Sequence, residues 1–155
     1  MATNSNVSPE RQIAFRLLRA NTLTLAVREL DVLSVVDLTE PTPLPFAPPS
    51  VIGIVSVQGR MFTVLDLSFL LDSDGANRKC KFIVALRGGE QLGLAVDDSN
   101  DVVEINASEI VTDSSSDLVS GRFQFDQADY SILNVEKLFA GVIRGRERRR
   151  RRVQS

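Results

Sequence analysis

The residues that could carry chemistry are few. The sequence has no His and one Cys, Cys80. Nothing can therefore activate a thiol as a nucleophile, and neither a disulfide framework nor a metal cage of His and Cys can form. We expect no catalytic residues, no metal site and no cofactor, and a passive thiol at Cys80.

Three nearby carboxylates, Asp97, Asp98 and Asp101, suggest a cation site or an acid–base pair. The pattern that binds hard cations, with alternating oxygen ligands, a central glycine and a terminal Glu, is missing. We therefore interpret this segment as a solvated turn. Gly88 and Gly89 are interpreted as a turn too, because the Lys-Ser/Thr and the helix start of a phosphate loop do not follow them.

The last dozen residues are strongly basic. Arg144, Arg146 and residues 148–152 supply seven positive charges, which leaves 11 basic against 19 acidic residues, a charge of −8, in residues 1–143. Such a tail could attract acidic lipid, nucleic acid or the protein's own acidic body. No aromatic residue interleaves it, so stacking on bases is unsupported. We expect residues 144–155 to be a disordered, solvated tail with weak non-specific attraction.

Length and hydropathy indicate one small domain. The chain has 155 residues, of which 43% are hydrophobic, enough for one domain or for two small halves that share a core. The polar start lacks the pattern of a signal peptide, and no apolar run approaches the ~20 residues of a membrane span. We expect a cytoplasmic protein with a disordered segment at 1–11, a domain at 12–143 and a boundary between two subdomains near 72–79.

The longest apolar, β-branched stretch, residues 50–67, predicts a buried hairpin. With Gly59 and Arg60 in a two-residue loop, Val57 lies opposite Phe62. With Gln58 and Gly59 in the loop, the register moves by two and every residue keeps its face. In either register Val55, Val57, Phe62 and Val64 form one apolar face.

The rest of the chain predicts short strands and little helix. Val32 to Leu38 is expected to be a strand with Val32, Ser34 and Val36 on one face, and the five prolines of residues 40–49 an extended segment. In a second hairpin Ala85 faces Leu92. The remaining predicted elements are strands at 12–20, 23–27, 102–105, 121–126 and 130–135 and helical segments at 68–71 and 136–140. This pattern favours an all-β fold of small barrels.

The order of these pieces resembles the CheW family, the adaptor domain of bacterial chemotaxis arrays. The resemblance extends from about Ala14 to Phe139 and rests on six segments in a fixed order. They are the two opening strands, Pro48-Pro-Ser-Val-Ile-Gly-Ile-Val-Ser-Val-Gln-Gly59, Val64-Leu-Asp-Leu67, Leu92-Gly-Leu-Ala-Val-Asp97, Asp101-Val-Val-Glu-Ile105 and Ile132-Leu-Asn-Val-Glu-Lys-Leu138.

The resemblance implies a fold and a role. Proteins of this family fold as two five-stranded, SH3-like barrels that share a core, with short helical turns and a C-terminal helix. They have no catalytic residues. They join the cytoplasmic tip of a methyl-accepting chemoreceptor to the regulatory domain of a CheA-type histidine kinase, which places them at membrane-associated receptor arrays.

The resemblance also implies two contact sites. Receptor contact maps to Val32, Ser34, Val35, Gly53, Ser56, Gln58 and Gly59, and kinase contact maps to Leu38, Thr39 and Leu44. For each receptor-contact residue taken singly, a core or turn role is the simpler explanation, and the surface prediction belongs to the group. Ser34 and Gln58 depart from the Glu and Arg that commonly form an ion pair in the family. Because both are replaced together, no buried charge is left unpaired, and folding is unaffected. The alternatives are a scaffold of a non-motility pathway and a module recruited by its basic tail.

Overall fold

Two mixed β-sheets make up most of the computed structural model, which describes residues 11–71, 80–113 and 116–141. One sheet has six strands in the order β8-β1-β2-β11-β10-β9, and the other has five in the order β3-β6-β7-β5-β4. The strands of the six-stranded sheet are β1 (Gln12–Ala20), β2 (Leu23–Arg28), β8 (Asp98–Asn106), β9 (Val111–Thr112), β10 (Val119–Phe125) and β11 (Ala128–Leu133). Those of the five-stranded sheet are β3 (Val32–Asp37), β4 (Val51–Val57), β5 (Arg60–Asp66), β6 (Phe82–Leu86) and β7 (Leu92–Val96).

Helical segments are short and stand at the ends of strands. They are the 3₁₀ turns η1 (Glu29–Asp31) and η2 (Ala107–Glu109), the helix α2 (Leu67–Leu71) and a helical segment at residues 135–141. The prediction of an all-β fold of two small barrels with short helical turns is confirmed, and the strands form two mixed sheets. The six-stranded sheet exceeds the expected five strands because the two-residue β9 pairs with β10.

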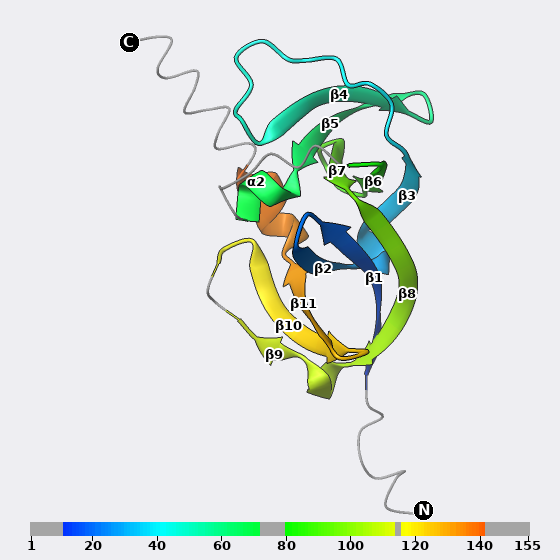
Figure 1. Cartoon of the computed structure of the whole chain (residues 1–155), viewed down its shortest axis with the longest axis vertical. Helices are drawn as coiled ribbons and strands as arrows, with labels where there is room; N and C mark the ends of the chain where they lie inside the picture. Colours follow the sequence, from blue (N-terminus) through cyan, green and yellow to red (C-terminus); the bar gives the residue numbers. More distant parts are fainter. Residues whose placement is uncertain (1–10, 72–79, 114–115, 142–155) are drawn as a thin grey trace, which may run out of the picture.

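The two sheets lie above one another, and β8 runs from one to the other (Figure 1). Apolar residues form three clusters. Phe15, Phe123 and Tyr130 belong to a cluster of the six-stranded sheet, and Val55 and Phe62 to one of the five-stranded sheet. The third and largest cluster takes residues from both sheets, from α2 and from residues 135–138. The expected shared core is therefore present.

The same order of features occurs twice along the chain, at positions 68 residues apart. Each of β4 and β10 has a bulge followed by a glycine, Gly53 or Gly121. Thirteen residues further on, the side chain of Asp66 or Asn134 caps the next helical segment by accepting a hydrogen bond from the amide three positions later, at 3.3 and 3.1 Å. The first half of the chain, residues 12–71, thus repeats in the second half, residues 80–141.

The halves exchange strands. The sheet that contains β4 and β5 is completed by β6 and β7 of the second half, and the sheet that contains β10 and β11 is completed by β1 and β2 of the first. Each sheet has two pairs that join the halves, one parallel and one antiparallel. They are β5 with β7 and β3 with β6 in one sheet, and β2 with β11 and β1 with β8 in the other. Neither sheet is therefore built by one half alone. The predicted boundary at 72–79 lies outside the described residues, as do the predicted disordered segments at 1–11, apart from Arg11, and at 144–155.

The hairpin registers correct two expectations. Val57 pairs with Arg60, so the loop is Gln58-Gly59 and the first choice, Gly59-Arg60, was wrong. Both loop residues have positive φ, 53° and 79°, as a type I′ turn requires. The predicted apolar face holds in this register. In the second hairpin Ala85 pairs with Gly93, one position away from the predicted Leu92, because residues 87–91 form a longer connection.

Two further segments depart from simple alternation. A bulge at Leu33 shifts the register of β3. Val32 and Val35 therefore pack in the cluster that both sheets share, whereas Leu33 and Val36 pack against the cluster of the five-stranded sheet. The predicted division of this strand into two alternating faces was therefore wrong. The predicted turn at 97–101 continues instead as the edge strand β8, with an irregularity opposite β1.

Candidate protein-interaction surfaces

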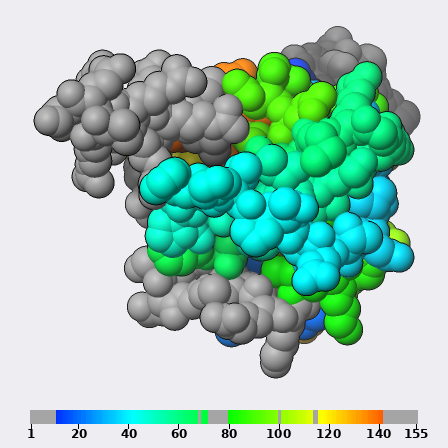
Figure 2. Space-filling view, turned by 90° about the horizontal axis from the view of Figure 1, so that it is seen from above, coloured from blue at the N-terminus to red at the C-terminus, as the bar shows by residue number. Residues whose placement is uncertain are grey.

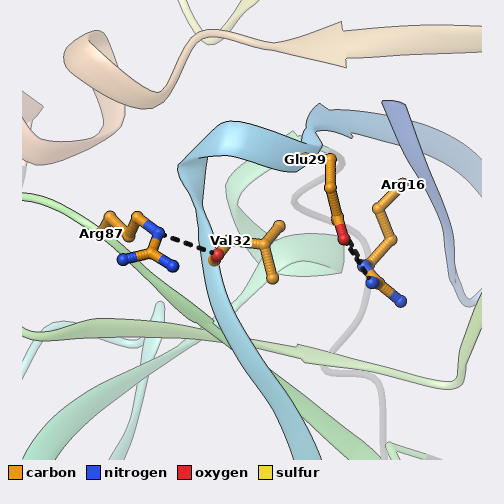
Figure 3. Close-up of polar contacts among 4 residues, drawn as sticks. All are labelled: Arg16, Glu29, Val32 and Arg87. Atoms are coloured by element: carbon orange, nitrogen blue, oxygen red, sulfur yellow. Dashed lines mark hydrogen bonds and ion pairs between the residues drawn. The ribbon is translucent and has the colours of Figure 1, made fainter. Parts of the chain in front are cut away.

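The junction of η1 and β3 is held by two arginines (Figure 3). The Arg16 guanidinium forms two hydrogen bonds to the Glu29 carboxylate, at 2.8 and 2.7 Å. Arg87 Nε donates to the Val32 carbonyl at 3.2 Å, and the Arg87 amide donates to the Asp31 carbonyl at 2.8 Å. Bidentate pairs of this kind fix geometry as well as adding energy. The start of β3, which carries three predicted receptor-contact residues, is thus held at one orientation.

The predicted receptor-contact residues divide into a buried and an exposed group. Val32 is 7% exposed, Gly53 is also buried, and Ser34 and Val35 are half-buried. The Ser34 hydroxyl is buried without a hydrogen-bond partner. The exposed members, at the tip of the β4–β5 hairpin, are Ser56, Gln58 and Gly59. The structure therefore offers one exposed surface, the hairpin tip, with the other predicted residues in β3 and at the base of β4.

The predicted kinase-contact residues lie in the connection from β3 to β4. Leu38 and Leu44 are half-buried and Thr39 is exposed. The Leu38 amide donates to the Lys81 carbonyl at 2.8 Å, and Leu38 packs beside the cluster of the five-stranded sheet. Further along the connection, Thr42 exchanges two hydrogen bonds of 2.8 Å with Ile54 of β4. The connection is therefore attached to the sheet at its start and near its middle.

Gly53 allows the connection to approach β4. A Cβ at this position would lie 2.5 Å from the Thr42 carbonyl oxygen, closer than real Cβ contacts occur. Any other side chain here would push the connection away from the strand. The glycine that the sequence predicts as a receptor contact thus has a structural task, which is to let the segment containing the predicted kinase contacts lie along β4.

One residue of the connection was missed by the sequence interpretation. Phe46 is 87% exposed, the most exposed of the large hydrophobic residues in the described part of the chain. It follows Pro45 in a turn closed by the Ala47 amide on the Leu44 carbonyl at 3.4 Å, and its φ is +60°. Glycine or Asn usually occupies this position of a type II turn. The sequence did contain a signal for this residue, because Phe46 is an aromatic residue among five prolines.

Two of the reactive groups considered in the sequence, Asp97 and Cys80, have surroundings that explain them without catalysis. The Asp97 carboxylate accepts a hydrogen bond from the Asn21 amide at 2.9 Å and so fixes the β1–β2 turn. Cys80 is half-buried, and its burial, together with the charges of Asp66 and Asp97, raises the pKa of the thiol to about 12. The thiol is therefore protonated at neutral pH, when it is a poor nucleophile and a poor metal ligand.

A second surface feature lies on the six-stranded sheet. It is an open hollow of about 490 Å³ lined by side chains of both charges and by two apolar ones. Its lining residues are Glu109, Val111, Arg122, Phe123, Gln124 and Asp129. None of the predicted contact residues lies in it. Among the described residues, no helix is both long enough and apolar enough to span a membrane.

Comparison with known families shows to which protein family this chain belongs. The model of the CheW-like domain matches residues 15–142, which is most of the chain and all of both sheets except the start of β1. The chain belongs to the CheW-like family. This is a family of non-enzymatic scaffold proteins that acts in chemotaxis signalling. A comparison with curated proteins finds no match.

A solved structure supports the fold assignment. The CheW-like chain is similar to the crystal structure of the scaffolding protein TtCheW from Thermoanaerobacter tengcongensis, with a TM-score of 0.69 and 21% sequence identity. The match covers 80% of this chain and 90% of that one. At this identity the similarity concerns the arrangement of the strands.

Proposed function

We propose that this CheW-like protein is a non-enzymatic adaptor that couples a methyl-accepting chemoreceptor to a CheA-type histidine kinase in chemotaxis-like signalling. The observation that carries the proposal is the family match over residues 15–142 on a fold of two sheets around one core. The adaptor would act in the cytoplasm, at membrane-associated receptor arrays.

The proposal assigns one surface to each partner. The receptor would contact the exposed hairpin tip at Ser56, Gln58 and Gly59, with the orientation of the tip supported by the buried residues of β3 and β4. The kinase would contact the β3–β4 connection at Leu38, Thr39 and Leu44. Both surfaces belong to the five-stranded sheet and its connections, and Thr42 and Gly53 join them.

The direct test is binding to each purified partner. Isothermal titration with the regulatory domain of the cognate kinase and, separately, with a receptor-tip fragment should give saturable binding. A Gln58→Glu variant should weaken receptor binding and leave kinase binding unchanged, because Gln58 is exposed at the tip. No binding to the kinase domain at high micromolar concentration would contradict the proposal.

The replacement of a common ion pair by Ser34 and Gln58 favours a related candidate, a CheW-like scaffold of a non-motility pathway. This candidate predicts binding to a kinase from a system without flagellar targets, measured in the same titration. Binding only to the kinase of the motility system would reject it.

The seven arginines of residues 144–152 favour a module recruited to nucleic acid or acidic membrane. Deleting residues 144–155 separates this candidate from the adaptor. The adaptor proposal expects the truncated chain to keep its kinase affinity. Loss of kinase binding on truncation would contradict the proposal that the kinase binds the domain and not the tail.

A further inference from the structure

We infer that Phe46 is the anchor of the kinase-binding surface, inserting into an apolar socket with a basic rim on the partner protein; this inference rests on the proposed function. The observation behind it is the 87% exposure of a Phe ring on a turn whose backbone disfavours any residue but glycine or Asn. Anchors of protein interfaces are often aromatic side chains of this kind.

The internal repeat provides a comparison for this connection, because its counterpart in the second half has a polar sequence. The Val51 amide donates to the Pro48 carbonyl, and 68 residues later the Val119 amide donates to the Ser116 carbonyl. The two connections thus end in the same backbone turn. In the first half the sequence before β4 is Pro43-Leu-Pro-Phe-Ala-Pro-Pro-Ser50, whereas the sequence before β10 is Thr112-Asp-Ser-Ser-Ser-Asp-Leu118.

A polar segment one residue shorter therefore leads into the corresponding strand of the second half. Hydrophobic residues that the fold does not require, and that lie in water, carry a cost in solubility. The exposed ring of Phe46, which has no aromatic counterpart in the sequence of residues 112–118, is explained by a contact that the second half does not make at this place.

The connection is preorganised for binding. Four prolines between residues 43 and 49 restrict φ, and the hydrogen bonds of Thr42 and Val51 fix both ends of the segment. A rigid loop loses little conformational entropy when it binds, so more of the contact energy remains as affinity. Figure 2 shows this segment, in cyan, on the outer face beside the green strands β4 and β5.

Charge identifies the kind of partner. Between Arg28 and Arg60 the sequence has four acidic residues and no basic one. Of these four, Asp37 and Glu40 are exposed at the entrance to the connection. A socket for Phe46 would therefore have Lys or Arg at its rim. A second copy that presents this same surface fits poorly, because the exposed carboxylates of Asp37 and Glu40 on the two copies would repel each other.

The test compares three variants in titrations against the kinase regulatory domain. Phe46→Ala removes the ring, and Phe46→Gly removes the ring while relieving the positive φ, so this variant should unfold at a higher temperature than the wild type. Both should weaken kinase binding about 30-fold, the change typical of an interface anchor. The matched control is Phe125→Ala, a surface Phe that is 37% exposed in the second half, and its affinity should stay within about twofold of wild type.

The outcomes separate this inference from the proposed function. If the wild type binds the kinase domain and Phe46→Gly binds equally well, the anchor assignment is wrong and the adaptor proposal stands. If the wild type does not bind, both fail. If sedimentation shows a dimer that Phe46→Gly converts to a monomer, the occupant is a second copy and the kinase assignment is overturned. Equal receptor binding by all variants confirms that none has lost its fold.

Discussion

The two halves of the chain share a framework and differ in what they attach to it. Gly53 and Gly121 stand at equivalent bulges, and each lies against a crossing backbone segment, at the Thr42 or the Val111 carbonyl. The crossing segment of the first half carries five prolines and an exposed Phe, whereas that of the second half is followed by a run of Ser and Asp. Elements that occur twice maintain the fold, and elements that occur once are the candidates for function.

The largest expected effect comes from adding a methyl group at the two glycines. A Cβ would lie 2.5 Å from the Thr42 oxygen at position 53 and 2.8 Å from the Val111 oxygen at position 121. We expect Gly53→Ala to lower the free energy of unfolding by about 2 to 3 kcal/mol and Gly121→Ala by about 1 to 2 kcal/mol. Urea denaturation followed by circular dichroism measures both. Equal losses, or no loss at either position, would contradict the argument from these two distances.

The equivalent caps provide the next comparison. Asp66→Ala and Asn134→Ala each remove a side chain that caps the helical segment after the second hairpin strand. We expect a loss of about 1 kcal/mol at Asn134 and about 2 kcal/mol at Asp66. The larger value belongs to Asp66 because it is only 4% exposed and water cannot replace its bonds. Thermal unfolding of the two variants measures the difference, and a larger loss at Asn134 would contradict the argument from burial.

Replacing one loop residue should make the hairpin tips more alike. The loop of the first half is Gln58-Gly59, and that of the second is Asp126-Gln127, with all four φ angles positive. Gln127 has a φ of 66° at the position where the first half has glycine. We expect Gln127→Gly to stabilise the protein by about 0.5 to 1 kcal/mol. Gly59→Gln is the reciprocal control and should destabilise by a similar amount, and the same urea titration reports both.

The effect that is smallest at neutral pH concerns Cys80, at the start of the second half. Because the pKa of the folded thiol is raised from 9.0 to about 12, the folded state keeps a proton that the unfolded chain loses. Stability from this group is complete below pH 9 and falls as the pH rises toward 12. We expect slow labelling by iodoacetamide at pH 8 in the native protein and fast labelling in urea. A Cys80→Ser variant should show a weaker loss of stability across that pH range, and an equal loss would contradict the role of the thiol.

The sequence predicted which elements exist better than how they pair. Hydrophobic alternation identified the faces of β4 and β5 correctly, because a shift of two residues preserves them. The register predicted for β6 and β7 was wrong by one residue. Every residue of β7 is buried, so no polar face was present to reveal the shift. The polar residues at 97–101 were also mispredicted as a turn. Most of them belong to the edge strand β8, and a strand at the edge of a sheet can expose polar side chains.

The candidate site was predicted only in part. Family resemblance directed attention to β3 and β4, but it could not show that Val32 and Gly53 are buried and that Ser56 and Gln58 are exposed. Burial depends on the bulges at Leu33 and Ile52, which no local pattern indicated. Phe46 escaped notice because an apolar residue is expected inside, and its exposure follows from the turn at Pro45.

The strand exchange has a consequence for synthesis on the ribosome. When residues 1–71 have emerged, β2 and β5 each present a free edge, because their parallel neighbours β11 and β7 have not yet been translated. Such edges invite pairing with other nascent chains. The sheet containing β5 can be completed once β7 is made, whereas the sheet containing β2 must wait for β11. The order of translation therefore sets the order in which the two sheets can close.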